Sequence, residues 1–151
     1  MTLEIQSAKQ QLIQMLQTVE AYVSSVSEKD LAQKPAPNKW SKKEIIGHLI
    51  DSGINNLQRF TEIQFTEKPY KVKKYNQDGL VKANDYQNAE ISEILGIWLA
   101  LNRRIIWIME QQSAETLAYE VILPSGELSN LHFLMTDYVD HFKYHLEQIM
   151  R

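Results

Sequence analysis

Apolar residues recur every three or four positions along four stretches of the chain, the spacing that places them on one face of a helix. These stretches cover about 3–26, 41–65, 85–111 and, from a start between 128 and 130, the rest of the sequence. Four helices of this length can bury their apolar faces only against one another. The pattern predicts an all-α four-helix bundle that forms a single domain over residues 1–151.

The same periodicity identifies the residues that the bundle would bury. The third helix has the most apolar interior, and its Trp98 and Trp107 are predicted to be core residues rather than part of a cofactor site. In the second helix, Ile54 continues the apolar stripe. All three side chains are therefore expected to lie inside the bundle.

The breaks between the stretches carry residues that end or begin helices. Lys34–Asn38 contains two prolines and is a predicted connector. Ser41 and Glu44 match a capping box, so the second helix is expected to begin there. The polar stretch from Pro69 to Asn84 predicts a long crossover loop, whose length makes it a candidate wall or lid of a site. Leu117–Leu123, followed by Pro-Ser-Gly, predicts a short extended segment before the last helix.

Charge and cysteine content exclude several classes of protein. With 16 Lys and Arg against 19 Asp and Glu, the net charge is −3, which argues against a nucleic-acid or anionic-membrane binder. No apolar run reaches the 18 or so residues of a membrane span, and the first residues lack the apolar stretch of a signal peptide, so a cytoplasmic location is expected. The absence of cysteine excludes disulfides, thiolate metal sites and a cysteine nucleophile.

Histidine placement is the most informative chemical feature of the sequence. His141 and His145 lie four residues apart, so their side chains stack on one face of the last helix, within its apolar stripe. His48 lies on the inward side of the second helix. His132, nine residues before His141, falls half a turn away and is expected to be solvated or peripheral.

Two interpretations of the inward histidines are open at this point. A single inward histidine is more often a hydrogen-bonded core residue than a ligand. Two at this spacing, with no shared partner, would cost several kcal/mol of desolvation. A third on another helix makes a divalent metal the simpler explanation. Three neutral imidazoles from His48, His141 and His145 would leave coordination positions open, as catalytic sites do.

Four other residues are candidates for proton transfer or for orienting a substrate: Asp51, Asn55, Asp137 and Tyr138. Asp51 and Asn55 follow His48 near the same face, although a solvated position is the simpler expectation for both. Asp137, like Asp140, could instead accept a hydrogen bond from an imidazole or be a plain solvated carboxylate. In the crossover loop, the residues expected at the site entrance are Tyr75, Asn76 and Gln77.

Two segments together carry a family resemblance: Trp40–Ser52 (WSKKEIIGHLIDS) and Asp140–Ile149 (DHFKYHLEQI). Their order and spacing resemble the DinB/YfiT superfamily of metal-dependent enzymes, over nearly the whole chain. The resemblance implies a four-helix bundle, often a homodimer, with a divalent metal such as Zn²⁺ or Ni²⁺ held by His48, His141 and His145. It also implies a small-molecule substrate, because relatives include S-transferases and isomerases that use low-molecular-weight thiols such as bacillithiol or mycothiol.

The leading hypothesis is therefore a metal-dependent enzyme that catalyses thiol-dependent S-transfer or hydrolysis of a small molecule. Since the chain has no cysteine, the nucleophile would have to be a water or a thiol cosubstrate. The alternative is a non-catalytic, stress-related protein that binds a metal or ligand. Because imidazole coordinates only when neutral, metal release is expected as pH falls through about 6–6.5.

Overall fold

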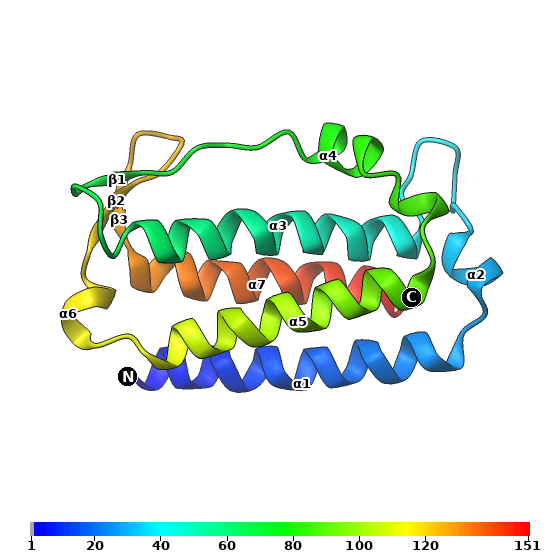
Figure 1. Ribbon diagram of the computed structural model, residues 1–151, viewed down its shortest axis with the longest axis horizontal. Helices are drawn as coiled ribbons and strands as arrows, with labels where there is room; N and C mark the ends of the chain where they lie inside the picture. The colour runs from blue at the N-terminus through cyan, green and yellow to red at the C-terminus, as the bar shows by residue number, and fades with distance from the viewer. Residues whose placement is uncertain (1) are drawn as a thin grey trace.

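The computed structural model describes residues 2–151, which form a bundle of four long helices (Figure 1). These are α1 (Leu3–Ser25), α3 (Lys42–Glu62), α5 (Ile91–Glu110) and α7 (Leu131–Ile149). Helix α3 packs on α5 and α7, and α1 packs on the same two helices from the other side. The predicted all-α bundle is confirmed.

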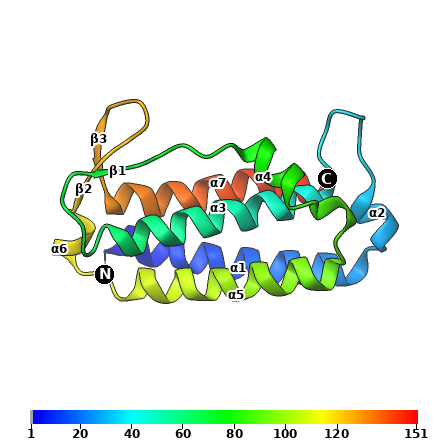
Figure 2. The same ribbon diagram turned by 45° about the horizontal axis from the view of Figure 1, so that its top comes forward.

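The helix directions explain the long connection in the middle of the chain. α1 and α7 run one way, whereas α3 and α5 run the other way (Figures 1 and 2). Since α3 and α5 are neighbours with the same direction, the chain must return the length of the bundle between them. The returning segment passes above α3 and α7 (Figure 2). This confirms the predicted crossover.

Short elements occupy the connections. They are α2 (Glu28–Ala32), β1 (Tyr70–Lys71), α4 (Gln77–Ala83), the 3₁₀ helix η1 (Tyr86–Asn88), α6 (Ala114–Leu117), β2 (Glu120–Ile122) and β3 (Leu128–Asn130). The strands form one sheet in the order β1-β2-β3, in which β1 is parallel and β3 antiparallel to β2. The sheet attaches the start of the crossover to the segment that leads into α7.

Two predicted boundaries are wrong. α5 begins at Ile91 rather than near Asp85, because Asp85 adopts a left-handed backbone conformation (φ 48°) and the chain then turns through η1. The predicted extended segment over 117–123 is only partly a strand, since α6 ends at Leu117 and β2 begins at Glu120.

The core is continuous along the bundle and includes Trp98, Phe142 and Phe60, all fully buried. Trp98 stacks on Phe142 with ring centroids 5.1 Å apart. Two residues predicted to be core are instead exposed, Ile54 to 50% and Trp107 to 48%. Trp107 packs at the surface against the guanidinium of Arg104, whose Cζ lies 5.2 Å from the ring centroid.

None of the helices within residues 2–151 combines the length and the apolar character that crossing a membrane requires.

Candidate metal centre and adjoining cavity

Three imidazoles from two helices converge on one point. The Nε2 atom of His141 lies 3.4 Å from Nε2 of His48 and 3.1 Å from Nε2 of His145. Two nitrogens bound at about 2.1 Å to the same ion would lie about 3.0 Å apart at a right angle and about 3.4 Å apart at the tetrahedral angle. Both distances from His141 therefore fit a shared divalent cation, and the ligand atoms of all three histidines lie within 4.8 Å of one another.

Local sequence places these side chains. Ser41 and Glu44 form the predicted capping box, which fixes the first turn of α3 and hence the direction in which His48 points. On α7, His141 and His145 are one turn apart. His132 is near the start of α7 and does not belong to the cluster, as predicted.

Burial keeps the imidazoles neutral. Desolvation, followed by the proximity of the other two histidines, lowers the pKa of His48 to about 3. Desolvation and His145 lower the pKa of His141 to about 4, and burial also lowers the pKa of His145. Neutral imidazole is the form that binds metal. The pH at which protons displace a bound metal is accordingly expected below the range of about 6–6.5 that the unperturbed residue suggests.

Two neighbouring side chains contact the histidine rings. The Nδ1 atom of His145 lies 2.8 Å from Oε1 of Gln148, a contact that turns Nε2 of the same ring toward the centre. Trp40 packs on His48 with ring centroids 4.9 Å apart. Nδ1 of His48 is buried and has no hydrogen-bond partner among residues 2–151.

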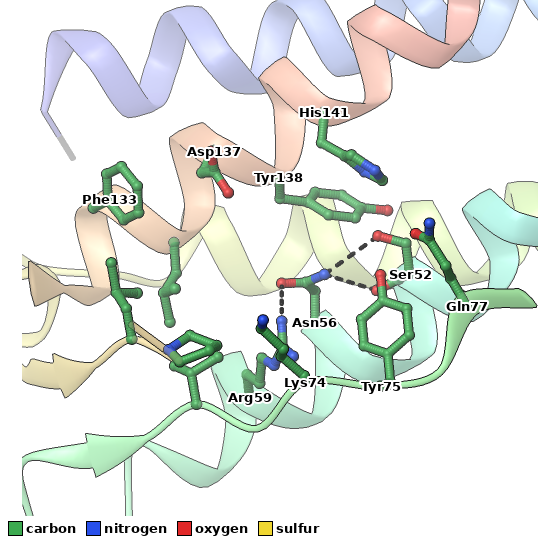
Figure 3. Close-up of a pocket in the computed structure, with 14 residues that line it drawn as sticks. Ser52, Asn56, Arg59, Lys74, Tyr75, Gln77, Phe133, Asp137, Tyr138 and His141 are labelled. Atoms are coloured by element: carbon green, nitrogen blue, oxygen red, sulfur yellow. Dashed lines mark hydrogen bonds between the residues drawn. The ribbon is translucent and has the colours of Figure 1, made fainter. Parts of the chain in front are cut away.

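A cavity of about 320 Å³ opens beside the histidines, between α3, α7 and the crossover segment (Figure 3). His141, Tyr138 and Asp137 project into it from α7, and Asn56 and Arg59 from α3. Its outer wall is formed by Lys74 and Tyr75, in the stretch that precedes α4, and by Gln77, the first residue of α4. The expectation that Tyr75 and Gln77 line the entrance is confirmed, whereas Asn76 caps α4 by accepting a hydrogen bond from the Gly79 amide at 2.9 Å.

Asp51 is buried rather than solvated, contrary to the simpler expectation. Its Oδ1 accepts hydrogen bonds from the Tyr86 hydroxyl at 2.6 Å and from the Asn84 amide at 3.0 Å. Burial raises the pKa of Asp51, and these two hydrogen bonds oppose the shift. Tyr86 also covers Gly47, where a Cβ would lie 2.1 Å from the tyrosine ring. Asp51 therefore ties the end of the crossover to α3.

The other three candidates lie in different surroundings. Asn55 donates a hydrogen bond to the Asp51 carbonyl at 2.8 Å and faces a neighbouring surface hollow instead of the cavity beside His141. Tyr138 is buried and its hydroxyl donates to Oδ1 of Asn102 at 2.6 Å. Asp137 faces the cavity, and its pKa is raised by burial and by the nearby Asp140.

Sequence reasoning missed several residues of the site. Asn102, which holds the Tyr138 hydroxyl, and Gln148, which holds His145, both act through side-chain contacts. Arg59 lies eleven residues after His48, which at 100° per residue returns it to within about 20° of the same face of α3. That spacing is a signal that could have identified it.

Comparison with known proteins places this geometry in a family. A model of the DinB superfamily matches residues 11–149. The chain belongs to the DinB superfamily. Two curated relatives share the name "Putative metal-dependent hydrolase". The Bacillus pumilus protein is 26% identical over 92% of this chain and 79% of its own length. The Halalkalibacterium halodurans protein is 25% identical over 87% and 75%.

Solved structures support the DinB fold. YfiT from Bacillus subtilis, described as "a probable metal-dependent hydrolase with an unusual four-helix bundle topology", superimposes with a TM-score of 0.87 over 99% of this chain and 86% of its own, at 20% identity. A mycothiol-dependent maleylpyruvate isomerase superimposes with a TM-score of 0.70 over 97% of this chain and 63% of its own, at 12% identity. At these identities the likeness shows the fold alone.

Proposed function

We propose that this DinB protein is a metal-dependent enzyme that binds a divalent cation, Zn²⁺ or Ni²⁺, through His48, His141 and His145 and acts on a small molecule. The observation that carries the proposal is the convergence of three histidines, two buried and one half-buried, with the Nε2 atom of His141 lying at the spacing of a shared ion from each of the other two. The names of the two curated relatives point the same way. Two reactions fit this site, hydrolysis and thiol-dependent S-transfer.

Two side chains that line the cavity are assigned the proton transfer and the orientation of the substrate. When bound, a cation with three neutral ligands keeps its full charge and lowers the pKa of a water or thiol beside it. Asp137 faces the cavity with a raised pKa, so it is the carboxyl group best placed to accept and return a proton. Tyr138 stays protonated because burial raises its pKa, and its hydroxyl is held by Asn102. It orients a substrate rather than removing a proton.

Asp51 and Asn55 have supporting roles in this proposal. Asp51 fixes the position of the crossover through Tyr86 and Asn84. Asn55 donates to the carbonyl of Asp51 one turn earlier in α3. Neither is assigned a proton transfer.

Elemental analysis of protein purified without an affinity tag tests whether a divalent metal is bound and which one it is. One Zn²⁺ or Ni²⁺ per chain is expected. Magnesium alone, or no divalent metal after incubation with either ion, would contradict the proposed site, since hard cations prefer oxygen ligands.

Turnover then distinguishes the two reactions. The metal-loaded protein is incubated with a panel of activated esters and amides, and separately with an electrophile plus a low-molecular-weight thiol. Acid release without thiol indicates hydrolysis, and thiol consumption indicates S-transfer. Because the chain contains no cysteine, a thiol-specific reagent gives no protein background. His141→Ala should abolish either signal and His132→Ala should not.

A metal that only stabilises the fold would favour the alternative of a non-catalytic binding protein. In that case chelation would lower the melting temperature by several degrees with no turnover found in either panel. A catalytic site would lose turnover on chelation while the helical circular dichroism signal stays intact.

Homodimer formation and a cytoplasmic location remain predictions. Light scattering of the purified chain checks the first, and fractionation of cells that express it checks the second. A monomer at micromolar concentration would contradict the predicted dimer.

A further inference from the structure

The wall of the cavity that faces α7 carries two positively charged side chains. Arg59 projects from α3 and Lys74 from the crossover, and both point into the cavity (Figure 3). None of the ion pairs among residues 2–151 involves either side chain. The nearby carboxylate of Glu62 is instead engaged by the Tyr70 hydroxyl at 2.7 Å and the Gln58 amide at 2.7 Å.

Arg59 is held in place by contacts that use only some of its hydrogen-bond donors. Its guanidinium donates to Oδ1 of Asn56 at 3.5 Å and to the carbonyl of Lys73, and the ring of Tyr75 lies beside it at 5.5 Å. A guanidinium has five N–H donors, so several remain for a ligand. Removing a charge from water without a counter-ion is costly. An oriented, half-buried guanidinium without a carboxylate partner is therefore suited to an anion from outside the chain.

Position along α3 relates this group to the histidines. Arg59 follows His48 by three turns, about 16 Å along the helix axis, on nearly the same face. Helical side chains point back toward the N-terminus, so the guanidinium reaches toward His48. Asp137 lies on the α7 wall across the cavity from Arg59 (Figure 3). An anion is thus attracted to the Arg59 end and repelled from the α7 wall.

We infer that the cavity binds a small molecule carrying a carboxylate or phosphate group, which Arg59 and Lys74 hold while the other end of the molecule reaches His141. This inference rests on the proposed function for the role of His141 but adds the substrate class. The overall charge of −3 would repel such molecules, so local positive charge is needed to attract them. The reacting group is then the end of the molecule distant from the anion.

Side-chain NMR of arginine tests the inference with succinate as the probe. The Nε–Hε resonance of Arg59 is assigned by its loss in Arg59→Gln and is followed in the chelator-treated protein at constant ionic strength. It should shift saturably with succinate and stay unchanged with succinamide, which has the same shape without charge. The signals of Arg103, Arg104 and Arg151 should not move. A parallel titration with methyl phosphate shows which of the two anions binds more tightly.

Variants give the expected magnitudes. Arg59→Gln should weaken succinate binding, followed by calorimetry, at least tenfold, and Lys74→Gln several-fold. Lys29→Gln removes the same charge from an exposed position away from the cavity and should have no effect. Because Lys74 is exposed, its variant tests the inference even if Arg59→Gln fails to fold.

The outcome separates the inference from the proposed function. Equal binding of succinate and succinamide, or Arg59 moving no more than the other arginines, would overturn the anion site. Metal content is measured separately, after part of the same preparation has been reloaded with Zn²⁺ or Ni²⁺ and freed of unbound ion. A saturable Arg59 shift in a protein that binds no metal would contradict the proposed enzyme and leave the anion site standing. Normal metal content without a shift of the Arg59 resonance would contradict the anion site and leave the proposed metal site standing.

Discussion

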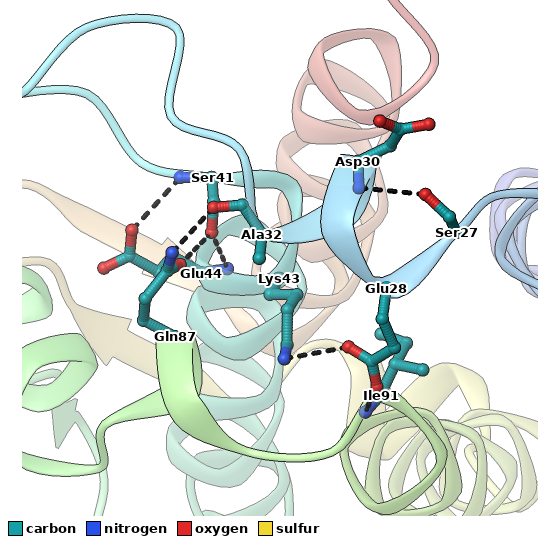
Figure 4. Close-up of polar contacts among 9 residues, drawn as sticks. All are labelled: Ser27, Glu28, Asp30, Ala32, Ser41, Lys43, Glu44, Gln87 and Ile91. Carbon is teal, nitrogen blue, oxygen red and sulfur yellow. Dashed lines mark hydrogen bonds and ion pairs between the residues drawn. The ribbon is translucent and has the colours of Figure 1, made fainter.

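Helix α3 contributes to two partly buried polar clusters that differ in where their polar groups find partners. The first is the N-terminal clasp, formed by Ser41, Lys43 and Glu44 with Glu28 and Gln87 (Figure 4). The second is the histidine cluster one turn further along the helix. In the clasp, polar groups find partners within the chain, whereas in the histidine cluster three nitrogens face one another.

The contacts of the clasp connect four elements. The Ser41 hydroxyl accepts from the Glu44 amide at 3.2 Å and donates to Gln87, whose amide donates to the Ala32 carbonyl at 2.6 Å. Lys43 pairs with Glu28 at 3.0 Å, and the other oxygen of Glu28 accepts from the first amide of α5, that of Ile91, at 2.8 Å. These bonds satisfy helix ends that would otherwise lose hydrogen bonds on burial.

A structural cluster thus differs from a functional one in whether its polar groups form hydrogen bonds and ion pairs with other residues of the chain. Buried polar groups in folded proteins are nearly always paired. Where several polar atoms converge on one point without such partners, a ligand that completes the pairing explains the arrangement. The clasp needs no ligand. The three Nε2 atoms of the histidine cluster, and the guanidinium of Arg59, which has no carboxylate partner among residues 2–151, are the groups suited to such a ligand.

The largest expected effect is loss of bound metal when a histidine of the second cluster is replaced. His48→Ala and His141→Ala should each reduce bound metal from one per chain to well under one, because either removes one of three ligands. Helix content should be retained, since the clasp and core are untouched. His132→Ala is the control and should bind metal normally. Equal metal loss in that variant would contradict the assignment. The measurements are elemental analysis and circular dichroism.

Gln148→Ala should have the next largest effect. It removes the acceptor that orients His145, and loss of such a partner typically lowers metal affinity by about 10- to 100-fold. Competition with a chromogenic chelator measures this change. Glu147→Ala, at an exposed position of the same helix, should leave the affinity unchanged. An unaltered affinity in Gln148→Ala would mean that the packing around His145 alone orients the ring.

The parts of the structure that sequence predicted are those with local causes. Helical periodicity identifies α1, α3, α5 and α7, and the spacing of His141 and His145 places both rings on one face of α7 without knowledge of the fold. The capping box between Ser41 and Glu44 is equally local. Helical periodicity also places His48 on the inward side of α3, and the family resemblance agrees with grouping it with the two histidines of α7.

The parts that sequence did not predict depend on contacts between distant segments. Asp51 is buried because Tyr86, 35 residues away, covers α3 at Gly47 and bonds its carboxylate. Ile54 is 50% exposed although it continues the apolar stripe, and periodicity alone cannot show which positions of a stripe a neighbouring element covers. Arg59 becomes part of a site only when the crossover places Lys74 and Tyr75 over it.

A smaller effect is expected from weakening the clasp. Ser41→Ala removes a helix cap and the bond to Gln87, so the free energy of unfolding should fall by about 1–2 kcal/mol. Ser113→Ala, in the exposed capping box of α6, should cost less. Denaturant unfolding of both variants gives the difference. Metal content should be normal in each, and loss of metal in Ser41→Ala would show that the two clusters are coupled.

The smallest effect is expected from the charge of Glu28. Its hydrogen bond from the Ile91 amide, and then its pairing with Lys43, hold the pKa of this carboxyl below its usual range. A carboxyl whose pKa is lowered in the folded state stabilises the protein above its unfolded pKa of about 4.5, and this stabilisation is lost as pH falls through the folded value.

Glu28→Gln keeps an oxygen that can accept from Ile91 but removes the charge. Because the Glu28 side chain is 52% exposed, the loss at pH 7 should be under about 1 kcal/mol. Between about pH 5 and 3 the variant should lose stability less steeply than the wild type, since it has one fewer carboxylate to protonate. Glu20→Gln, at an exposed position of α1, is the matched control. A slope identical to that of the wild type would mean that the bond to Ile91, rather than charge, accounts for the contribution of Glu28.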